Sequence, residues 1–230
     1  MEEIISGLWR IPLASGSVNV YAWPGADGLT LVDCGYAGSG QHILYVLSEA
    51  GYAPQDVRRI VITHGDLDHV GGLAALQAAT GAEVLAHSQE VDFIEGKRPR
   101  PWGRTVAGWL LARGDRLLAS TGLFRIEPVR VGRALMDGDT LDGGWQVVHT
   151  PGHTPGHIAL HHPEKQALIS GDILSQRSGR LIGPVPAYAV DMKQAAASLH
   201  KLALLEPQTL CFGHRQPLTN VKPDALYHLA

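Results

Sequence analysis

The chain has 230 residues with 22 acidic and 19 basic side chains, a net charge of −3 and 45% hydrophobic residues. This composition is typical of a soluble globular α/β protein, and it argues against generic binding to nucleic acid. No apolar span is long enough for a transmembrane helix and no signal peptide is present, so we expect a cytoplasmic protein without a membrane partner. At this length we expect a single domain over residues 1–230.

The first half of the chain alternates strand-like and helix-like segments. Two helices are predicted. Ser39–Ala50 carries apolar residues at helical spacing and ends at Gly51, and Leu73–Ala79 is rich in Ala and Leu and is closed by Gly81. Short apolar segments bounded by turn residues predict strands at Leu8–Leu13, Val18–Trp23, Leu29–Asp33, Ile60–Ile62 and Glu83–Ala86. This order predicts a layered α/β arrangement with helices on a sheet face.

The second half repeats the layout of the first without repeating its sequence. A long Ala/Leu-rich helix is predicted at Met192–Leu205. Strands are predicted at Arg125–Val131, Trp145–His149, Ile158–His161, Ala167–Ser170 and Thr209–Phe212. The two cysteines, Cys34 and Cys211, lie in apolar strand-like segments, so we expect reduced core residues.

A basic and aromatic segment, Gly96–Thr121, separates the two halves. A short helix is predicted near Val106–Arg113, after the break at Pro99 and Pro101. One interpretation is a solvated basic connector or an oligomer contact, which leaves a homodimer open. The other is a cover over the functional site, with apolar contacts from Trp102, Trp109 and Leu110 and with Arg98, Arg100 or Arg104 available for an anionic group.

Four potential metal ligands follow the strand Ile60–Ile62, namely His64, Asp66, Asp68 and His69. His64 and Asp66 are two residues apart, so on an extended backbone they point the same way. A turn at 65–68 then directs the other two towards a neighbouring point, which suggests two adjacent metal positions. The alternative is ordinary turn chemistry, in which an Asp merely caps a helix.

Three later segments repeat this device of an apolar strand, a small residue and then a ligand. The segment 147–157 presents His149, His153 and His157 at intervals of four, which is more than the site needs. Ser170-Gly171 leads into Asp172, and Gly213 leads into His214. If these strands are neighbours, the side chains gather at one edge of the sheets.

Taken in order, these blocks resemble the metallo-β-lactamase superfamily. The resemblance rests on 63–69, 151–154, 170–172 and 213–214, together with the early strand and Asp-Cys-Gly of 31–35. It covers nearly the whole chain except Gly96–Thr121. It implies a four-layered αββα sandwich of two similar halves, with the metal site at the edge of the two sheets.

The resemblance also implies the ligands of two divalent metal ions. One ion takes His64, Asp66 and His153, the other takes Asp68, His69 and His214, and Asp172 bridges the two. It places Asp33 behind a ligating histidine, whose orientation the carboxylate fixes. His149 and His157 have no metal role in the pattern. The family's second histidine is Asp66 here, so zinc is expected but iron or manganese stays open.

The implied function is hydrolysis of a small-molecule substrate. A hydroxide held by the two metals attacks an ester, thioester or lactone carbonyl, and Asp68 steers it. Asp68 and Asp172 are thus the catalytic candidates. The alternatives are a diiron oxidoreductase acting on oxygen or nitric oxide, which Asp66 would suit, and a phosphodiesterase or nuclease, which only the basic segment favours. A non-catalytic scaffold is the weakest interpretation, because every metal block is intact.

Overall fold

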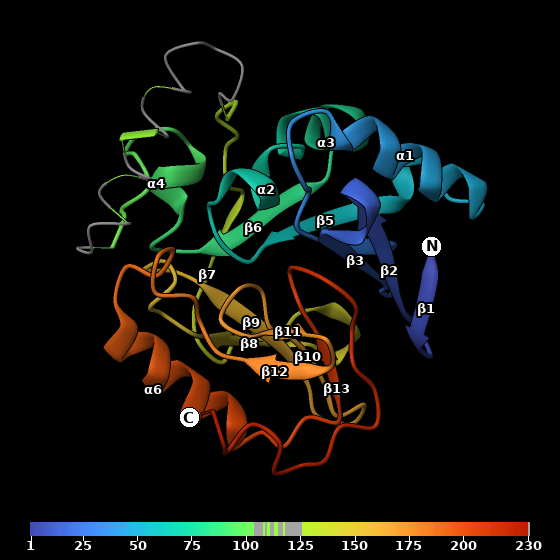
Figure 1. The fold of residues 1–230 in the computed structure, drawn as a ribbon. Helices are drawn as coiled ribbons and strands as arrows, with labels where there is room; N and C mark the ends of the chain where they lie inside the picture. Colours follow the sequence, from blue (N-terminus) through green and yellow to red (C-terminus); the bar gives the residue numbers. More distant parts are fainter. Residues whose placement is uncertain (104–107, 109, 111–112, 115–116, 118–125, 230) are drawn as a thin grey trace.

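The computed structural model describes residues 1–103, 108, 110, 113–114, 117 and 126–229. Two sheets pack face to face, and helices cover their outer faces (Figure 1). Within the described ranges the first sheet has seven strands in the order β1 to β7, and the second has four in the order β13-β10-β9-β8. This is the αββα sandwich that the resemblance implies.

The elements of the two halves have the following bounds. The first sheet contains β1 (Glu2–Ile5), β2 (Leu8–Leu13), β3 (Val18–Pro24), β4 (Leu29–Val32), β5 (Val57–Ile62), β6 (Glu83–His87) and β7 (Arg133–Leu135). The second contains β8 (Gln146–His149), β9 (Ile158–His162), β10 (Ala167–Ile169) and β13 (Thr209–Cys211), and β11 (Ser175–Arg177) pairs with β12 (Arg180–Ile182). The helices are α1 (Ser39–Glu49), α2 (Leu67–Val70), α3 (Leu73–Thr80), α4 (Val91–Ile94) and α6 (Met192–Ala203).

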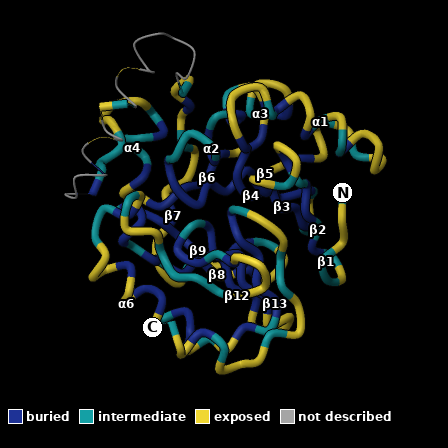
Figure 2. The backbone as a smooth tube through the Cα atoms, in the orientation of Figure 1, coloured by how far each residue is buried: buried dark blue, intermediate teal, exposed yellow. Residues whose placement is uncertain are grey.

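Alternation along the strands builds three hydrophobic layers. In β5, Ile60 and Ile62 join the cluster that includes residues of α1 and α3, whereas Val61 joins the cluster between the sheets. In β10, Ala167 and Ile169 join the cluster between the sheets, whereas Leu168 lies in a third cluster with α6 residues such as Leu199. Successive strand residues point to opposite faces, so both sheets bury both faces. Figure 2 shows the resulting buried sheets between more exposed helices.

Strand direction brings the ligand-bearing loops to one edge. β4, β5 and β6 run parallel, so the segments after them leave the first sheet on the same side. β10 is parallel to β13, and β8 and β10 are both antiparallel to β9, so these three strands also end together. The two edges are joined where the Ile158 N–H donates to the Thr63 carbonyl oxygen at 3.0 Å.

One predicted strand, Arg125–Val131, is wrong. The described residues 126–131 form no strand, and β7 comes later. The segment instead packs against α4, because Val129 is buried and its N–H donates to the Ile94 carbonyl at 3.3 Å. Pro128 has no N–H to offer a ladder. The other predicted strands, and the three predicted helices that lie within the described residues, are confirmed within a few residues. The elements β1, β7, β11, β12, α2 and α4 were not predicted.

Two further expectations concern burial and membrane association. Cys34 and Cys211 are both free thiols in the core, as expected, and burial raises the pKa of Cys211 to about 12.

No helix among the described residues combines the length and the apolar character needed to cross a membrane. Most of the predicted helix Val106–Arg113 lies outside the described residues.

Candidate metal centre

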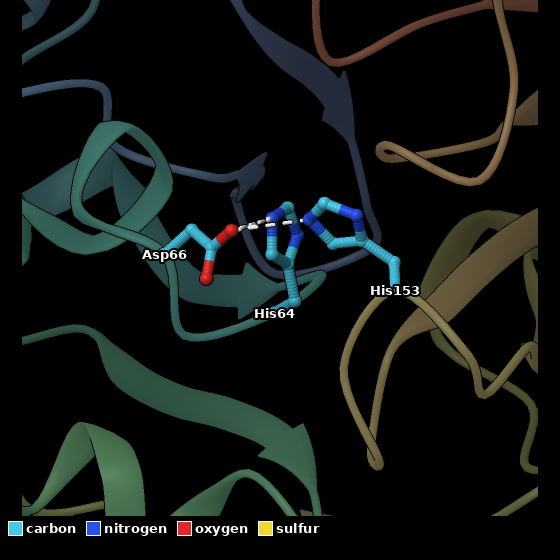
Figure 3. A group of neighbouring side chains, drawn as sticks. All are labelled: His64, Asp66 and His153. Atoms are coloured by element: carbon cyan, nitrogen blue, oxygen red, sulfur yellow. Dashed lines mark hydrogen bonds and ion pairs between the residues drawn. The ribbon is translucent and has the colours of Figure 1, made fainter. Parts of the chain in front are cut away.

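The first group of donors consists of His64, Asp66 and His153. One donor atom from each lies within 4.8 Å of the other two. Asp66 Oδ2 is 3.1 Å from Nε2 of His153 and 3.5 Å from Nε2 of His64, and Figure 3 shows the three side chains converging from two different loops. Asp66 occupies the N-cap position of α2 but its side chain makes no capping hydrogen bond, so the alternative of a simple helix cap is wrong.

The second group consists of Asp68, His69 and His214. Its donor atoms also lie within 4.8 Å of one another. Nε2 of His214 is 3.4 Å from Asp68 Oδ2, and Nε2 of His69 is 4.0 Å from Asp68 Oδ1. α2 begins directly after Asp66, so its first turn redirects Asp68 and His69 away from the first group. The turn therefore separates the four ligands of the first loop into two sets.

Asp172 lies between the two groups. Its Oδ1 is 3.5 Å from Nε2 of His69, and its Oδ2 is 3.0 Å from Nε2 of His214 and 4.0 Å from Nε2 of His153. All seven residues predicted as ligands are therefore brought together in the predicted partition. Their roles as ligands remain predictions.

Hydrogen bonds hold three of the imidazoles with Nε2 towards the centre. Nδ1 of His69 donates to Asp33 Oδ2 at 2.8 Å, and Nδ1 of His214 donates to the Ser17 carbonyl at 2.7 Å. Thr63 Oγ1 donates to Asp33 and lies 3.0 Å from Nδ1 of His64. With Nδ1 committed to these partners, each of the three rings turns Nε2, the atom that a metal ion would bind, towards the centre. Asp33 lies behind a histidine of the centre, as predicted.

The chemistry of these donors fits divalent cations. Within the described part of the chain, Nε2 of His64, Nε2 of His69 and Oδ1 of Asp172 are buried and have no hydrogen-bond partner. Leaving such atoms unpaired is costly, and three of them converge here. Imidazole nitrogen with carboxylate oxygen is the donor set of zinc, iron and manganese sites.

Two carboxylates of the centre, those of Asp66 and Asp172, are held ionised. Burial acts to raise the pKa of Asp66, but Arg100, His64 and His153 outweigh it and hold that pKa well below its usual value. Burial likewise opposes ionisation of Asp172, and its neighbours His69 and His214 overcome it and keep the pKa low. Both groups are ready to bind a cation.

Glu90 and His157 support the centre, and sequence reasoning did not single out Glu90. Its two carboxylate oxygens accept hydrogen bonds of 2.8 Å from the N–H groups of Gly65 and Gly156, which joins the two loops of the first donor group. Only its position after β6 hinted at this role. Nε2 of His157 accepts from the backbone N–H of Asp172 at 3.0 Å, and burial holds its pKa well below the usual value.

Three glycines are required by close packing around the centre. A Cβ on Gly71 would overlap backbone atoms of Tyr36 and Ala37, and one on Gly213 would overlap Asp172 Oδ1. A Cβ on the neighbouring Gly72 would overlap the Cys34 carbonyl oxygen in the same way. At Gly213, the missing side chain lets the loop with His214 pass directly beside Asp172.

The start of the basic segment reaches the first donor group. Arg100 forms a two-pronged ion pair with Asp66, in which Nε contacts Oδ1 and Nη2 lies 2.8 Å from Oδ2. Arg98 pairs with Asp92 at 3.0 Å and is largely exposed. Arg100 is thus committed to Asp66, and the expectation that it is available for an anionic group is wrong. Arg104 and Trp109 lie outside the described residues, so the cover remains a prediction.

Comparisons with known proteins agree on one family. Residues 13–214 match the family model described as the metallo-beta-lactamase superfamily. The chain is 29% identical over 204 residues to a probable metallo-hydrolase, YflN, of Bacillus subtilis (strain 168), covering 82% of this chain and 76% of that protein. It is 32% identical over 200 residues to a hydroxyacylglutathione hydrolase of Cereibacter sphaeroides, covering 86% of this chain but 62% of that protein.

Solved structures give the same picture. A metallo-beta-lactamase family protein, TTHA1429 from Thermus thermophilus, matches with a TM-score of 0.73 and 25% identity, covering 98% of this chain and 79% of the other. The protein TTHA1623, solved in a di-iron-bound form, matches with a TM-score of 0.70 and 29% identity, covering 92% of this chain and 94% of the other.

Proposed function

This chain belongs to the metallo-beta-lactamase superfamily, and from that premise we propose that it is a metal-dependent hydrolase acting on an ester, thioester or lactone carbonyl of a small molecule. The relatives named as metallo-hydrolases and hydroxyacylglutathione hydrolases support this class. The observation that carries the proposal is the convergence of three buried, unpartnered donor atoms, from His64, His69 and Asp172, in the described part of the chain.

The residues would hold two ions. His64, Asp66 and His153 would bind one, Asp68, His69 and His214 the other, and Asp172 both. Two adjacent divalent ions would lower the pKa of a water between them from about 15.7 towards ~7 and polarise the carbonyl oxygen of the substrate. The chain's own task is to keep these donors fixed and correctly protonated, which the bonds to Asp33, Ser17 and Thr63 support.

Asp68 is the candidate for steering the attacking group. Its side chain is 23% exposed, whereas that of His69 in the same group is fully buried. A carboxylate at the open side of the centre can accept a proton from the attacking water as well as bind an ion. The exposed Tyr36 lies near this group, because partial burial and then the charge of Asp68 raise its pKa.

The test is a hydrolysis screen on the zinc-loaded protein with lactone, thioester, ester and phosphodiester panels, together with elemental analysis. We expect about two metals per chain and turnover confined to carbonyl substrates. Turnover of phosphodiesters alone, or metal content well below two, would contradict the proposal. Asp68→Asn is the matched variant: it keeps the shape and one oxygen donor but cannot take up a proton, so we expect it to lose most turnover.

A second candidate function is a diiron centre that reduces oxygen or nitric oxide. The observation that favours it is the carboxylate of Asp66 in the first donor group, since hard oxygen donors suit iron. The structural relative solved in a di-iron-bound form is consistent with it. Zinc loading separates the two functions, because a redox-inert ion should support hydrolysis and silence an oxidoreductase.

A further inference from the structure

A positively charged side chain, Arg100, contacts the first donor group. Asp66 Oδ2 faces the Nε2 atoms of His64 and His153 and also contacts Nη2 of Arg100 at 2.8 Å. Its Oδ1 contacts Nε of Arg100. One carboxylate is therefore shared between a metal position and a guanidinium.

Arg100 is fixed where it lies. Its side chain is 8% exposed, and its guanidinium carbon sits 4.0 Å from the ring centre of Trp102. Nη1 donates to the Pro101 carbonyl at 2.9 Å and Nη2 to the Tyr188 carbonyl at 3.0 Å. A planar guanidinium held by a ring, two carbonyls and a carboxylate cannot swing away cheaply. Its charge is thus a permanent part of the first donor group.

The charges of the pair cancel. Two neutral imidazoles and one carboxylate give the first donor group a charge of −1, and the buried guanidinium restores it to zero. An imidazole in place of Asp66 would give zero without any arginine. The Asp66–Arg100 pair therefore presents a ligand oxygen while keeping the charge that three histidines would have.

We propose that Arg100 tunes the first metal position: its guanidinium offsets the charge of the Asp66 carboxylate, so that Asp66 and Arg100 act together as a neutral ligand. This rests on the proposed metal centre but not on the carbonyl substrate. It makes Arg100 a specificity-determining residue for the ion, acting through Asp66.

The inference gives four variants a definite order of affinity. The charge of the first group is zero in the natural protein, −1 in Arg100→Gln, +1 in Asp66→His, and zero again in the double variant. A unit charge a few Å from a divalent ion in a partly buried site changes affinity by roughly tenfold or more. We expect Arg100→Gln to bind most tightly, Asp66→His most weakly, and the other two to agree within a few-fold.

The experiment is a titration of each metal-free variant with Zn²⁺ and, separately, Mn²⁺ against a chromophoric chelator, without substrate. His153→Ala identifies which binding step belongs to the first position. Arg98→Gln is the matched control, because it removes a positive charge from the same segment but its partner is Asp92. It should leave both steps unchanged. Arg100→Lys keeps the charge without the fork and should stay near the natural affinity.

Each result has a clear meaning. Unchanged or weaker first-step affinity in Arg100→Gln would overturn the inference, because Arg100 would then only anchor its segment or position Asp66. A double variant weaker than Asp66→His would overturn it too. If the natural protein takes up no metal at all, the proposed function fails together with this inference. If the natural protein binds two metals but the affinity of the first position does not depend on Arg100, only this inference fails.

Discussion

The two donor groups differ in exposure and in what stands behind them. In the first, the side chains of His64, Asp66 and His153 are 0%, 15% and 4% exposed. In the second, His69 is fully buried but Asp68 is 23% and His214 is 29% exposed. The first group is backed by an arginine from the basic segment, and the second by Asp33 and a backbone carbonyl.

This difference assigns the two groups different tasks. The first group is closed to solvent and Arg100 offsets the charge of Asp66, which would suit an ion that stays bound and polarises the substrate carbonyl. An open position beside an exposed carboxylate suits the end of the site where substrate and water enter. We therefore expect changes in the first group to alter metal affinity and choice, and changes in the second to alter turnover.

The largest effect is expected for the residue shared by both groups. Asp172→Ala removes a donor that lies near His69, His153 and His214 at once. We expect loss of both metals and a fall in activity beyond the roughly 10- to 100-fold typical of outer partners. Elemental analysis with steady-state kinetics measures it.

Asp172→Asn serves as the control for shape, because it keeps the volume and loses the charge. We expect it to lose metal from both positions as well. Retention of one metal at full affinity in Asp172→Ala would mean that Asp172 serves a single ion.

The two outer carboxylates should act unequally on the two groups, because Asp33 contacts His69 directly but reaches His64 only through Thr63. Asp33→Asn weakens the hold on Nδ1 of His69, and Glu90→Gln replaces an acceptor for Gly65 or Gly156 by an amide donor. We expect about 10- to 100-fold weaker binding at the second position for Asp33→Asn and at the first for Glu90→Gln. Chelator titrations of the two variants, run in parallel, give both steps. Equal weakening of both steps in both variants would erase the distinction between the groups.

The ligand at position 66 should also set the pH at which activity rises. Asp66→His removes a negative charge, so the metal pair attracts electrons more strongly and its water becomes more acidic. Activity should therefore rise at a pH about one unit lower than in the natural protein. The metal preference should move from iron or manganese towards zinc. Matching pH profiles and metal selectivities, in variants shown to hold two metals, would contradict this.

The sequence predicted the layers and the ligands for a physical reason. Each candidate ligand follows a short apolar strand, and the direction of parallel strands brings such residues to one edge, as His64 and Asp172 show. Local spacing also separated Asp66 from Asp68. The family resemblance then fixed the partition into two sets.

The remaining features depend on contacts that no local pattern encodes. Glu90 bridges two loops that lie far apart in the chain, one at Gly65 and the other at Gly156. The pairing of Arg100 with Asp66 spans 34 residues and follows from the path of the basic segment. The segment 126–131 was interpreted as a strand from its apolar residues, but a short apolar segment can be buried without pairing with another strand, as Val129 shows. The sequence did not reveal which polar groups far apart in the chain form hydrogen bonds and ion pairs with one another.

The smallest effect concerns the support under the His153 loop. His87 stacks on His149 with ring centres 4.0 Å apart, and Nε2 of His149 donates to the Pro155 carbonyl of that loop. Burial, followed by the charge of His149, lowers the pKa of His87 from 6.5 to about 4. The unfolded chain takes up this proton near pH 6.5 and the folded chain only near pH 4, so stability is full above 6.5 and falls as the pH drops through that window. Between pH 6.5 and pH 4 we expect the free energy of unfolding of the metal-free protein to fall by about 1–2 kcal/mol because of this residue.

The test replaces His87 by a ring that cannot titrate. His87→Phe keeps a ring against His149, so its unfolding midpoint should fall less than that of the natural protein between pH 6.5 and pH 4. His200→Phe, on the exposed side of α6, is the control and should follow the natural protein. Parallel curves for His87→Phe and the natural protein would show that the stack carries no proton-linked stability.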